Sequence, residues 1–243
     1  MAYKENPKTK GSGIICAIPQ TGPCPHKCED CFFQSGRSYL EPLAENLPNL
    51  PEDFDGRVVR VNDGNDSGVD IETVLAATER YPMKFFNTAL PGAVSRLPGP
   101  VVLTVNPGGM TDVSWHKVAP IPKNLMFVRF RTNTWNLDMC DAVVQYYSAR
   151  EVPIVLTFMA YYTGRVVDDG YVSRKRTLNE YQAITTAAWR NVMRRYQNVK
   201  WVHSCGKIEG ETGDTKCRFC GNCLREYFAT KERMRAAQTE DQK

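Results

Sequence analysis

Residues 13–31 read GIICAIPQTGPCPHKCEDC, an apolar run that leads directly into a loop with three cysteines. The run 13–18 is short, rich in isoleucine and followed by proline and glycine, which predicts a buried β-strand. Cys24, Cys28 and Cys31 then follow in a C-x3-C-x2-C spacing, on a loop that also carries two prolines. The stretch therefore predicts a strand that delivers three thiols to one candidate site.

Further runs of the same kind recur along the chain. They are β-branched or aromatic, bounded by Gly, Pro, Asn or Asp, and mostly apolar on both sides. Such strands are typical of a parallel sheet that is covered by helices. The runs are residues 57–62, 84–90, 101–106, 126–132, 152–160 and 201–205.

Helical patterns lie between several of these strands. Asp70 is placed to cap a helix over residues 71–81, and residues 137–149 form a second helical stretch. The run Thr177-Leu178-Asn179-Glu180 has the form of a capping box, which predicts the start of a long helix. One face of that helix would carry Leu178, Tyr181, Ile184, Ala188, Val192 and Tyr196. The segments after Leu90 and Gly109 are rich in Pro and Gly, which predicts short or irregular crossovers.

Alternating strands and helices indicate an α/β fold, either a barrel or an open doubly wound sheet. In both architectures, ligands bind where strands end and loops begin. The cysteine loop directly follows the first strand, so we expect the site at that edge of the sheet.

Composition narrows the class of protein. Of the 243 residues, 42% are hydrophobic and 24% are charged, with a net charge of +4 that permits an anionic substrate. No apolar run reaches membrane-spanning length and the N-terminus lacks a secretory core, so we expect a cytoplasmic protein without a membrane partner. Seven of the nine cysteines fall in two tight groups, which in a reducing compartment indicates metal ligands. We expect the other two, Cys16 and Cys140, to be buried as small hydrophobic residues.

Three thiolates on one short loop can hold a cubane iron–sulfur cluster and leave one iron without a protein ligand. An open iron can bind a substrate or cofactor. The alternative is a structural zinc site, for which His26 or His116 could supply the fourth ligand.

The C-x3-C-x2-C motif after a first strand resembles that of the radical S-adenosylmethionine (radical SAM) superfamily. The resemblance implies that Cys24, Cys28 and Cys31 hold a [4Fe-4S] cluster whose fourth iron is chelated by S-adenosylmethionine. It also implies reductive cleavage of S-adenosylmethionine to a 5'-deoxyadenosyl radical, which abstracts hydrogen from a substrate. Flavodoxin or ferredoxin would donate the electron.

Two positions depart from the pattern of that family. Asp30 stands where the family often has an aromatic residue, although Phe32 and Phe33 follow the third cysteine. A turn over residues 62–68 replaces the Gly-Gly-Glu-like turn that binds the methionine amino group. We assign Asn62, Asp63 and Asn65 to that role, because their oxygens can accept from an ammonium.

Later strand ends carry further candidates for cofactor binding. Asn106 ends the fourth strand, and Arg129 and Arg131 lie on one side of the fifth because strand side chains alternate. An arginine inside a barrel is costly unless it meets an anion, so a cofactor carboxylate is one partner. Solvated arginines or internal ion pairs are the alternative.

A second cysteine group, Cys205, Cys217, Cys220 and Cys223, has the spacing C-x11-C-x2-C-x2-C. The last three resemble ferredoxin runs more closely than zinc ribbons, which favours a second [4Fe-4S] cluster over zinc. Many radical SAM enzymes carry such an auxiliary cluster. Full cysteine ligation would suit an electron conduit or a structural staple.

Together these features predict a partial (β/α)6-type TIM-like barrel over residues 1–204 and a small Cys-rich extension over residues 205–243. We expect the extension to end in a charged, frayed tail from Lys231. The substrate would be nucleotide-like or another small molecule, because little sequence precedes the first strand for a peptide-binding module. The alternatives are a peptide-modifying radical SAM maturase and a non-enzymatic binding module stapled by zinc or iron–sulfur sites.

Overall fold

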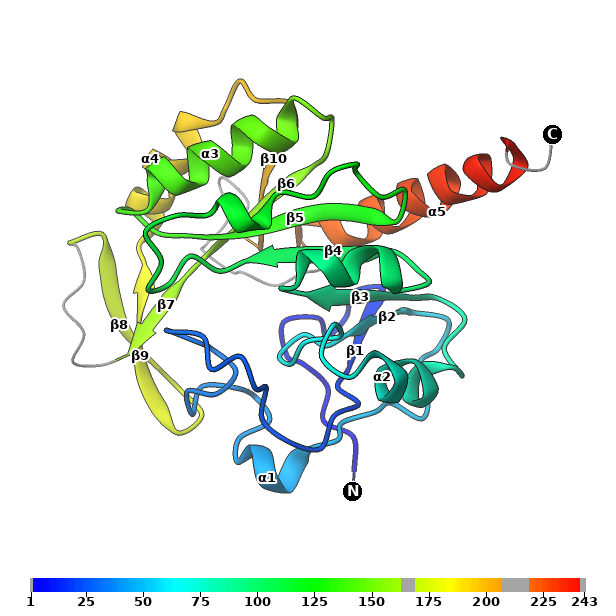
Figure 1. The fold of residues 1–243 in the computed structure, drawn as a ribbon. Helices are drawn as coiled ribbons and strands as arrows, with labels where there is room; N and C mark the ends of the chain where they lie inside the picture. Colours follow the sequence, from blue (N-terminus) through cyan, green and yellow to red (C-terminus); the bar gives the residue numbers. More distant parts are fainter. Residues whose placement is uncertain (1, 163–168, 207–218, 241–243) are drawn as a thin grey trace.

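A computed structural model describes residues 2–162, 169–206 and 219–240 of the chain. Seven parallel strands form one sheet in the order β1-β2-β3-β4-β5-β6-β10, curled into a half barrel (Figure 1). All seven strands expected from the sequence are present. Their bounds are β1 Ile14–Ala17, β2 Val58–Val61, β3 Lys84–Thr88, β4 Val101–Val105, β5 Leu125–Thr132, β6 Ile154–Phe158 and β10 Val202–Ser204.

Helices cover the convex face of the sheet. The helices are α2 (Ile71–Thr78), α3 (Leu137–Ser148) and α4 (Thr186–Arg195), and all three contribute to the main apolar core (Figure 1). Asp70 caps α2 as expected, since its side chain accepts from the Thr73 amide at 3.2 Å. Burying this apolar face supplies most of the stability of the helices.

The other crossovers contain only short helices, and those after Leu90 and Gly109 are irregular, as their Pro- and Gly-rich sequences predict. Between β1 and β2 the chain forms only the four-residue helix α1 (Leu43–Asn46). The 3-10 turns η1 (Pro91–Arg96) and η2 (Ser114–His116) follow β3 and β4.

The concave face of the sheet is divided along the strands. Near the strand beginnings it is apolar, and helix α5 (Asn222–Glu240) covers it with Cys223, Leu224 and Tyr227. Because side chains alternate, the residues two positions further along each strand point to the same side. These are polar: Phe85 is followed by Asn87, Val102 by Thr104, Phe127 by Arg129 and Val155 by Thr157. The polar half of the concave face therefore lies at the carboxyl ends of the strands.

Helix α5 corrects the expectation of a frayed tail from Lys231. The helix continues to Glu240 and runs beyond the edge of the sheet (Figure 1). Arg233 donates from Nη2 to the Leu125 carbonyl at 2.7 Å, which ties the helix to the start of β5. Most of the charged residues between Lys231 and Arg235 are exposed on this helix.

The capping-box prediction at Thr177 is also wrong. Residues on both sides of Thr177 form an antiparallel hairpin, β8 (Tyr171–Arg176) and β9 (Asn179–Ile184), which joins β7 (Ala160–Tyr162) in a three-stranded sheet of order β7-β9-β8. Thr177 occupies the left-handed region, with φ of 53°, in the hairpin turn. The helix begins only at Thr186, where the Thr185 side chain accepts from the Ala188 amide at 3.2 Å.

In the described part of the chain, no helix combines the length and the apolar character needed to cross a bilayer.

Candidate functional site

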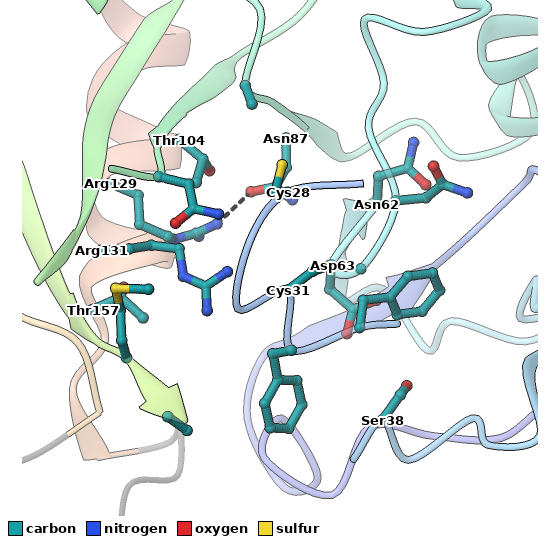
Figure 2. Close-up of a pocket in the computed structure, with 18 of the residues that line it drawn as sticks. Cys28, Cys31, Ser38, Asn62, Asp63, Asn87, Thr104, Arg129, Arg131 and Thr157 are labelled. Carbon is teal, nitrogen blue, oxygen red and sulfur yellow. Dashed lines mark hydrogen bonds between the residues drawn. The ribbon is translucent and has the colours of Figure 1, made fainter. Parts of the chain in front are cut away.

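A pocket of about 370 Å³ opens at the carboxyl ends of the parallel strands, between the cysteine loop and the three-stranded sheet. Cys24, Cys28 and Cys31 all line it. The predicted cofactor residues also line it, namely Asn62, Asp63, Asn65, Asn106, Arg129 and Arg131. The fold thus gathers these candidates from the cysteine loop, β5 and the ends of β2 and β4 around one cavity (Figure 2).

Hydrogen bonds hold the cysteine loop in place. The Cys31 amide donates to the Cys28 carbonyl at 3.2 Å, closing a turn. Gln34 Nε2 donates to the Cys24 carbonyl at 2.6 Å, and Asn65 Nδ2 donates to the Gly22 carbonyl at 3.0 Å. Asn65 therefore links the turn after β2 to the cysteine loop.

Glycines after β4 let that strand's loop lie directly against the cysteine loop. A Cβ on Gly108 would come within 2.9 Å of the Glu29 carbonyl oxygen, and Gly109 has φ of +70°. The Asn106-Pro107-Gly108-Gly109 run is thus explained by close backbone approach. The two glycines could be read from the sequence, but only the structure shows that the cysteine loop packs against them.

The three thiols influence one another. The pKa of Cys24 is raised to about 11, chiefly by burial and in smaller part by Asp66, Cys28 and Cys31. Burial and then Cys31 also raise the pKa of Cys28, while Asn106 and Arg131 act in the opposite direction. The thiols are therefore close enough to couple electrostatically, and a metal that binds them would have to displace their protons.

A cluster site needs a suitable donor set, and the cysteine loop supplies it. Three thiols of one loop line the same wall of the pocket, with Arg131 nearby as a countercharge. Across the described ranges, however, no group of three or more His, Cys, Asp and Glu side chains is arranged as a metal site. The loop therefore supplies three thiols at one pocket, the donor type that iron–sulfur clusters use.

Two asparagines present unused acceptors. Asn62 is buried with φ of 61°, and its Nδ2 donates to Ser67 Oγ at 3.1 Å. The Oδ1 atoms of Asn62 and Asn106 are buried and have no hydrogen-bond partner among the residues that the structure describes. An unsatisfied buried acceptor costs free energy, so both oxygens suit a ligand that brings N–H or O–H donors.

Asp63 and Asn65 are occupied within the protein. The Asp63 carboxylate accepts from Asn6 Nδ2 at 2.6 Å, from Tyr39 at 3.4 Å and from Arg60 at 3.3 Å. Asn65 uses its Oδ1 for the Asp66 amide and its Nδ2 for the cysteine loop. Both residues line the pocket, and their side chains stabilise its shape.

The arginines of β5 behave differently from each other. Arg129 Nη1 donates to Asn87 Oδ1 at 2.9 Å, while Arg131 points from the strand toward the loop with Cys28 and Cys31 (Figure 2). Burial lowers the pKa of Arg131, and Cys31 is the first of several groups that raise it. The Arg131 guanidinium forms no hydrogen bond with any described residue. It is thus the stronger candidate for binding an anionic group in the pocket.

The three-stranded sheet contributes a further wall of the pocket. Ala160, Arg174, Tyr181 and Ala183 line the pocket from three neighbouring strands. Cross-strand pairs place Ala160 opposite Ala183 and Arg174 opposite Tyr181. The sequence analysis missed this wall because it assigned Tyr181 to a helix. Arg174 is exposed and lies at the rim of the pocket.

This wall is anchored to the segment that follows the cysteines. The Arg37 guanidinium lies over the Phe32 ring at 5.4 Å and over the Tyr181 ring at 5.9 Å. The Leu178 amide donates to the Gly36 carbonyl at 3.0 Å, and Asn179 Nδ2 donates to the Ser35 carbonyl at 2.7 Å. The hairpin and the cysteine loop are therefore joined as one structural unit.

The second cysteine group is described in part. Cys205 lines the pocket and packs in the same apolar cluster as Cys223 at the start of α5. Cys220 precedes that helix, and Cys217 lies outside the described residues. Of the described members, Cys205 therefore lies at the same cavity as the first group, and Cys223 packs in the apolar cluster with it.

The two histidines considered as zinc ligands have different surroundings. His26 Nε2 lies 3.2 Å from Asp66 Oδ2 at the pocket wall. His116 is fully buried in η2 against Tyr146 and Tyr147, where burial and Lys117 lower its pKa to about 4. It does not line the pocket, so His26 is the histidine placed to complete a zinc site.

Comparison of the chain with protein-family models, with curated proteins and with solved structures gave no match.

Proposed function

We propose that this chain is a radical SAM enzyme whose cysteine loop holds a [4Fe-4S] cluster. The observation that carries the proposal is the position of Cys24, Cys28 and Cys31 on one wall of a pocket at the carboxyl ends of a parallel half barrel. That edge is where α/β folds place their active sites. Within this proposal the fold is a partial TIM-like barrel.

The residues around the cysteines suit S-adenosylmethionine. The unsatisfied Oδ1 atoms of Asn62 and Asn106 can accept from its ammonium or ribose hydroxyls. Arg131 can pair with its carboxylate, because a guanidinium binds a carboxylate through two parallel hydrogen bonds. Asp63 and Asn65 hold the surrounding backbone through the bonds described above. When bound, the cluster and S-adenosylmethionine supply reductive cleavage and abstraction of hydrogen from the substrate.

The protein positions and shields the reacting groups. The hairpin wall, tied to the cysteine loop through Arg37, limits the access of water to the pocket. An external donor such as flavodoxin or ferredoxin would provide the electron. A second [4Fe-4S] cluster at Cys205, Cys217, Cys220 and Cys223 would lie next to the pocket, because Cys205 lines it.

Anaerobic reconstitution tests the proposal. With both clusters present, the wild-type protein should bind about eight irons per chain and S-adenosylmethionine. After reduction it should release 5'-deoxyadenosine. Replacing Cys24, Cys28 and Cys31 together with alanine should remove about four irons and abolish S-adenosylmethionine binding and the product.

A matched control is Cys140→Ala, which removes a buried thiol in α3 that does not line the pocket. It should retain the iron, S-adenosylmethionine binding and the product of the wild type. Persistence of 5'-deoxyadenosine in the triple variant would overturn the assignment of the cysteines. Stoichiometric zinc without S-adenosylmethionine binding would instead identify a metal-stapled binding module.

A further inference from the structure

Among the described residues that line the pocket, positive side chains outnumber negative ones. Five of these residues are cations, and two, Asp63 and Asp66, are carboxylates. Both carboxylates are buried and already accept hydrogen bonds from the protein. The cations are Lys8, Arg60, Arg129, Arg131 and Arg174.

The first cluster and S-adenosylmethionine would not change this balance. A resting cubane core held by three thiolates carries one net negative charge, and S-adenosylmethionine carries one net positive charge. A second cluster held by four thiolates beside Cys205 would add two negative charges. What is left for the substrate is therefore decided by which individual cations lack a partner, and not by the net charge of the pocket.

Most of the arginines in the pocket have an assigned partner. Arg60 pairs with Asp63 at 3.3 Å, and Arg129 donates to Asn87 at 2.9 Å. Arg131 faces the cysteine loop, where the cofactor carboxylate is proposed to lie. Arg174 has neither an ion pair nor a hydrogen bond within the described residues, although it lines the pocket.

The hairpin wall leaves space beside Arg174. Strand pairing places Arg174 opposite Tyr181, with Ala160 and Ala183 as a neighbouring pair on the same face. Two alanines leave the centre of this wall shallow, while Tyr181 and Arg174 provide an aromatic ring and a guanidinium next to it. Lys175 follows directly in β8 but points to the opposite face and does not line the pocket.

We propose that the substrate carries a phosphate or carboxylate group that Arg174 binds on the hairpin wall. The proposal rests on the proposed function for the identity of the pocket, and it adds the chemical class of the substrate. A guanidinium binds either oxyanion through paired N–H donors. Because Arg174, Cys28 and Cys31 line the same pocket, the rest of the substrate would extend into the cavity that the cluster faces.

Calorimetric titration of the reconstituted full chain tests this assignment. S-adenosylmethionine is present in excess, so that its own site is filled, and ionic strength is held constant. The probes are inorganic pyrophosphate and succinate, which separate a phosphate site from a carboxylate site. We expect one of them to bind the wild type saturably, and R174Q to weaken that binding by about tenfold or more.

K175Q is the matched control, because it removes the same charge from the next residue of the strand on the opposite face. It should change probe affinity by less than about twofold, and R174K should recover part of the loss. Equal probe affinities in R174Q and K175Q, or no saturable binding of either probe to the wild type, would overturn the assignment. Iron content and S-adenosylmethionine binding are measured in the same samples, and their absence from the wild type would count against the proposed function separately.

Discussion

Replacing Asp66 by asparagine should destabilise the turn that follows β2 and lines the pocket. The Asp66 carboxylate is 4% exposed, and both of its oxygens accept from backbone amides. Oδ1 accepts from the Gly68 amide and from Thr88 Oγ1, both at 2.7 Å, and Oδ2 accepts from the Ala89 amide at 2.7 Å. Whichever way an asparagine amide is turned, its NH₂ group must face a backbone N–H.

The magnitude follows from these contacts. One hydrogen bond to a charged acceptor is lost, at about 1.5–3 kcal/mol, and a buried N–H is left opposite another donor. We expect D66N to lower the free energy of unfolding by about 2–4 kcal/mol. For a chain of this size, that corresponds to a fall in Tm of about 5–12 °C.

Urea denaturation of the metal-free protein provides the measurement. The control is D55N, the same substitution at a side chain that is 69% exposed and 3.6 Å from Arg57. It should cost less than about 0.5 kcal/mol, because exposed ion pairs contribute little. If D66N and D55N unfold at the same urea concentration with the same m-value, the reasoning about buried donors at this turn is refuted.

The remaining predictions concern packing, acid stability and the hairpin wall. G64A should cost about 1–3 kcal/mol in urea denaturation, because a Cβ would lie 2.2 Å from the Phe33 ring, whereas G92A meets nothing within 4 Å and should be neutral or slightly stabilising. The pKa of His116 is about 4 in the folded protein, below its unfolded value near 6.5, so the unfolded chain binds more protons and stability should fall by about 1–2 kcal/mol as pH drops through that window. H116F should flatten this dependence in denaturation series at several pH values. R37M removes the cation between two aromatic rings and should speed hydrogen exchange of the β9 amides, with β3 amides unchanged as the internal reference.

The parallel sheet could be predicted because its signal is local and repeated. Each strand is a short apolar run with a turn residue after it, and burial on both faces leaves few alternatives. Strand parity also placed Arg129 and Arg131 on one side, where they line the pocket. The strands and the alternation of their side chains depend on neighbouring residues of the same segment, so they can be predicted from the sequence.

The hairpin wall could not be predicted in the same way. Thr177 to Glu180 satisfies the capping-box pattern, and Tyr181 and Ile184 fit a helical stripe. In the folded protein Asn179 to Ile184 pair with β8, and Tyr181 also pairs with β7. Asn179 Nδ2 contacts the segment after Cys31 by donating to the Ser35 carbonyl at 2.7 Å. Tertiary pairing outweighs weak helical propensity, so the prediction failed where long-range contacts decide the structure.

The proposed ligand-binding residues of the pocket come from two structural elements, the parallel sheet with its loops and the antiparallel hairpin sheet. The cysteine loop, Asn62, Asn106 and Arg131 are all attached to the parallel sheet, either in a strand or directly after one. Arg174 and Tyr181 instead belong to a separate antiparallel sheet, which contacts the cysteine loop chiefly through side chains and a few backbone bonds. Under the proposed function, the parallel scaffold would keep the residues for the cluster and cofactor while the hairpin changes. Substitutions on the pocket face of β8 and β9 should then alter which substrate binds and leave iron content unchanged, whereas substitutions at the ends of β2, β4 and β5 should affect cofactor binding for every substrate.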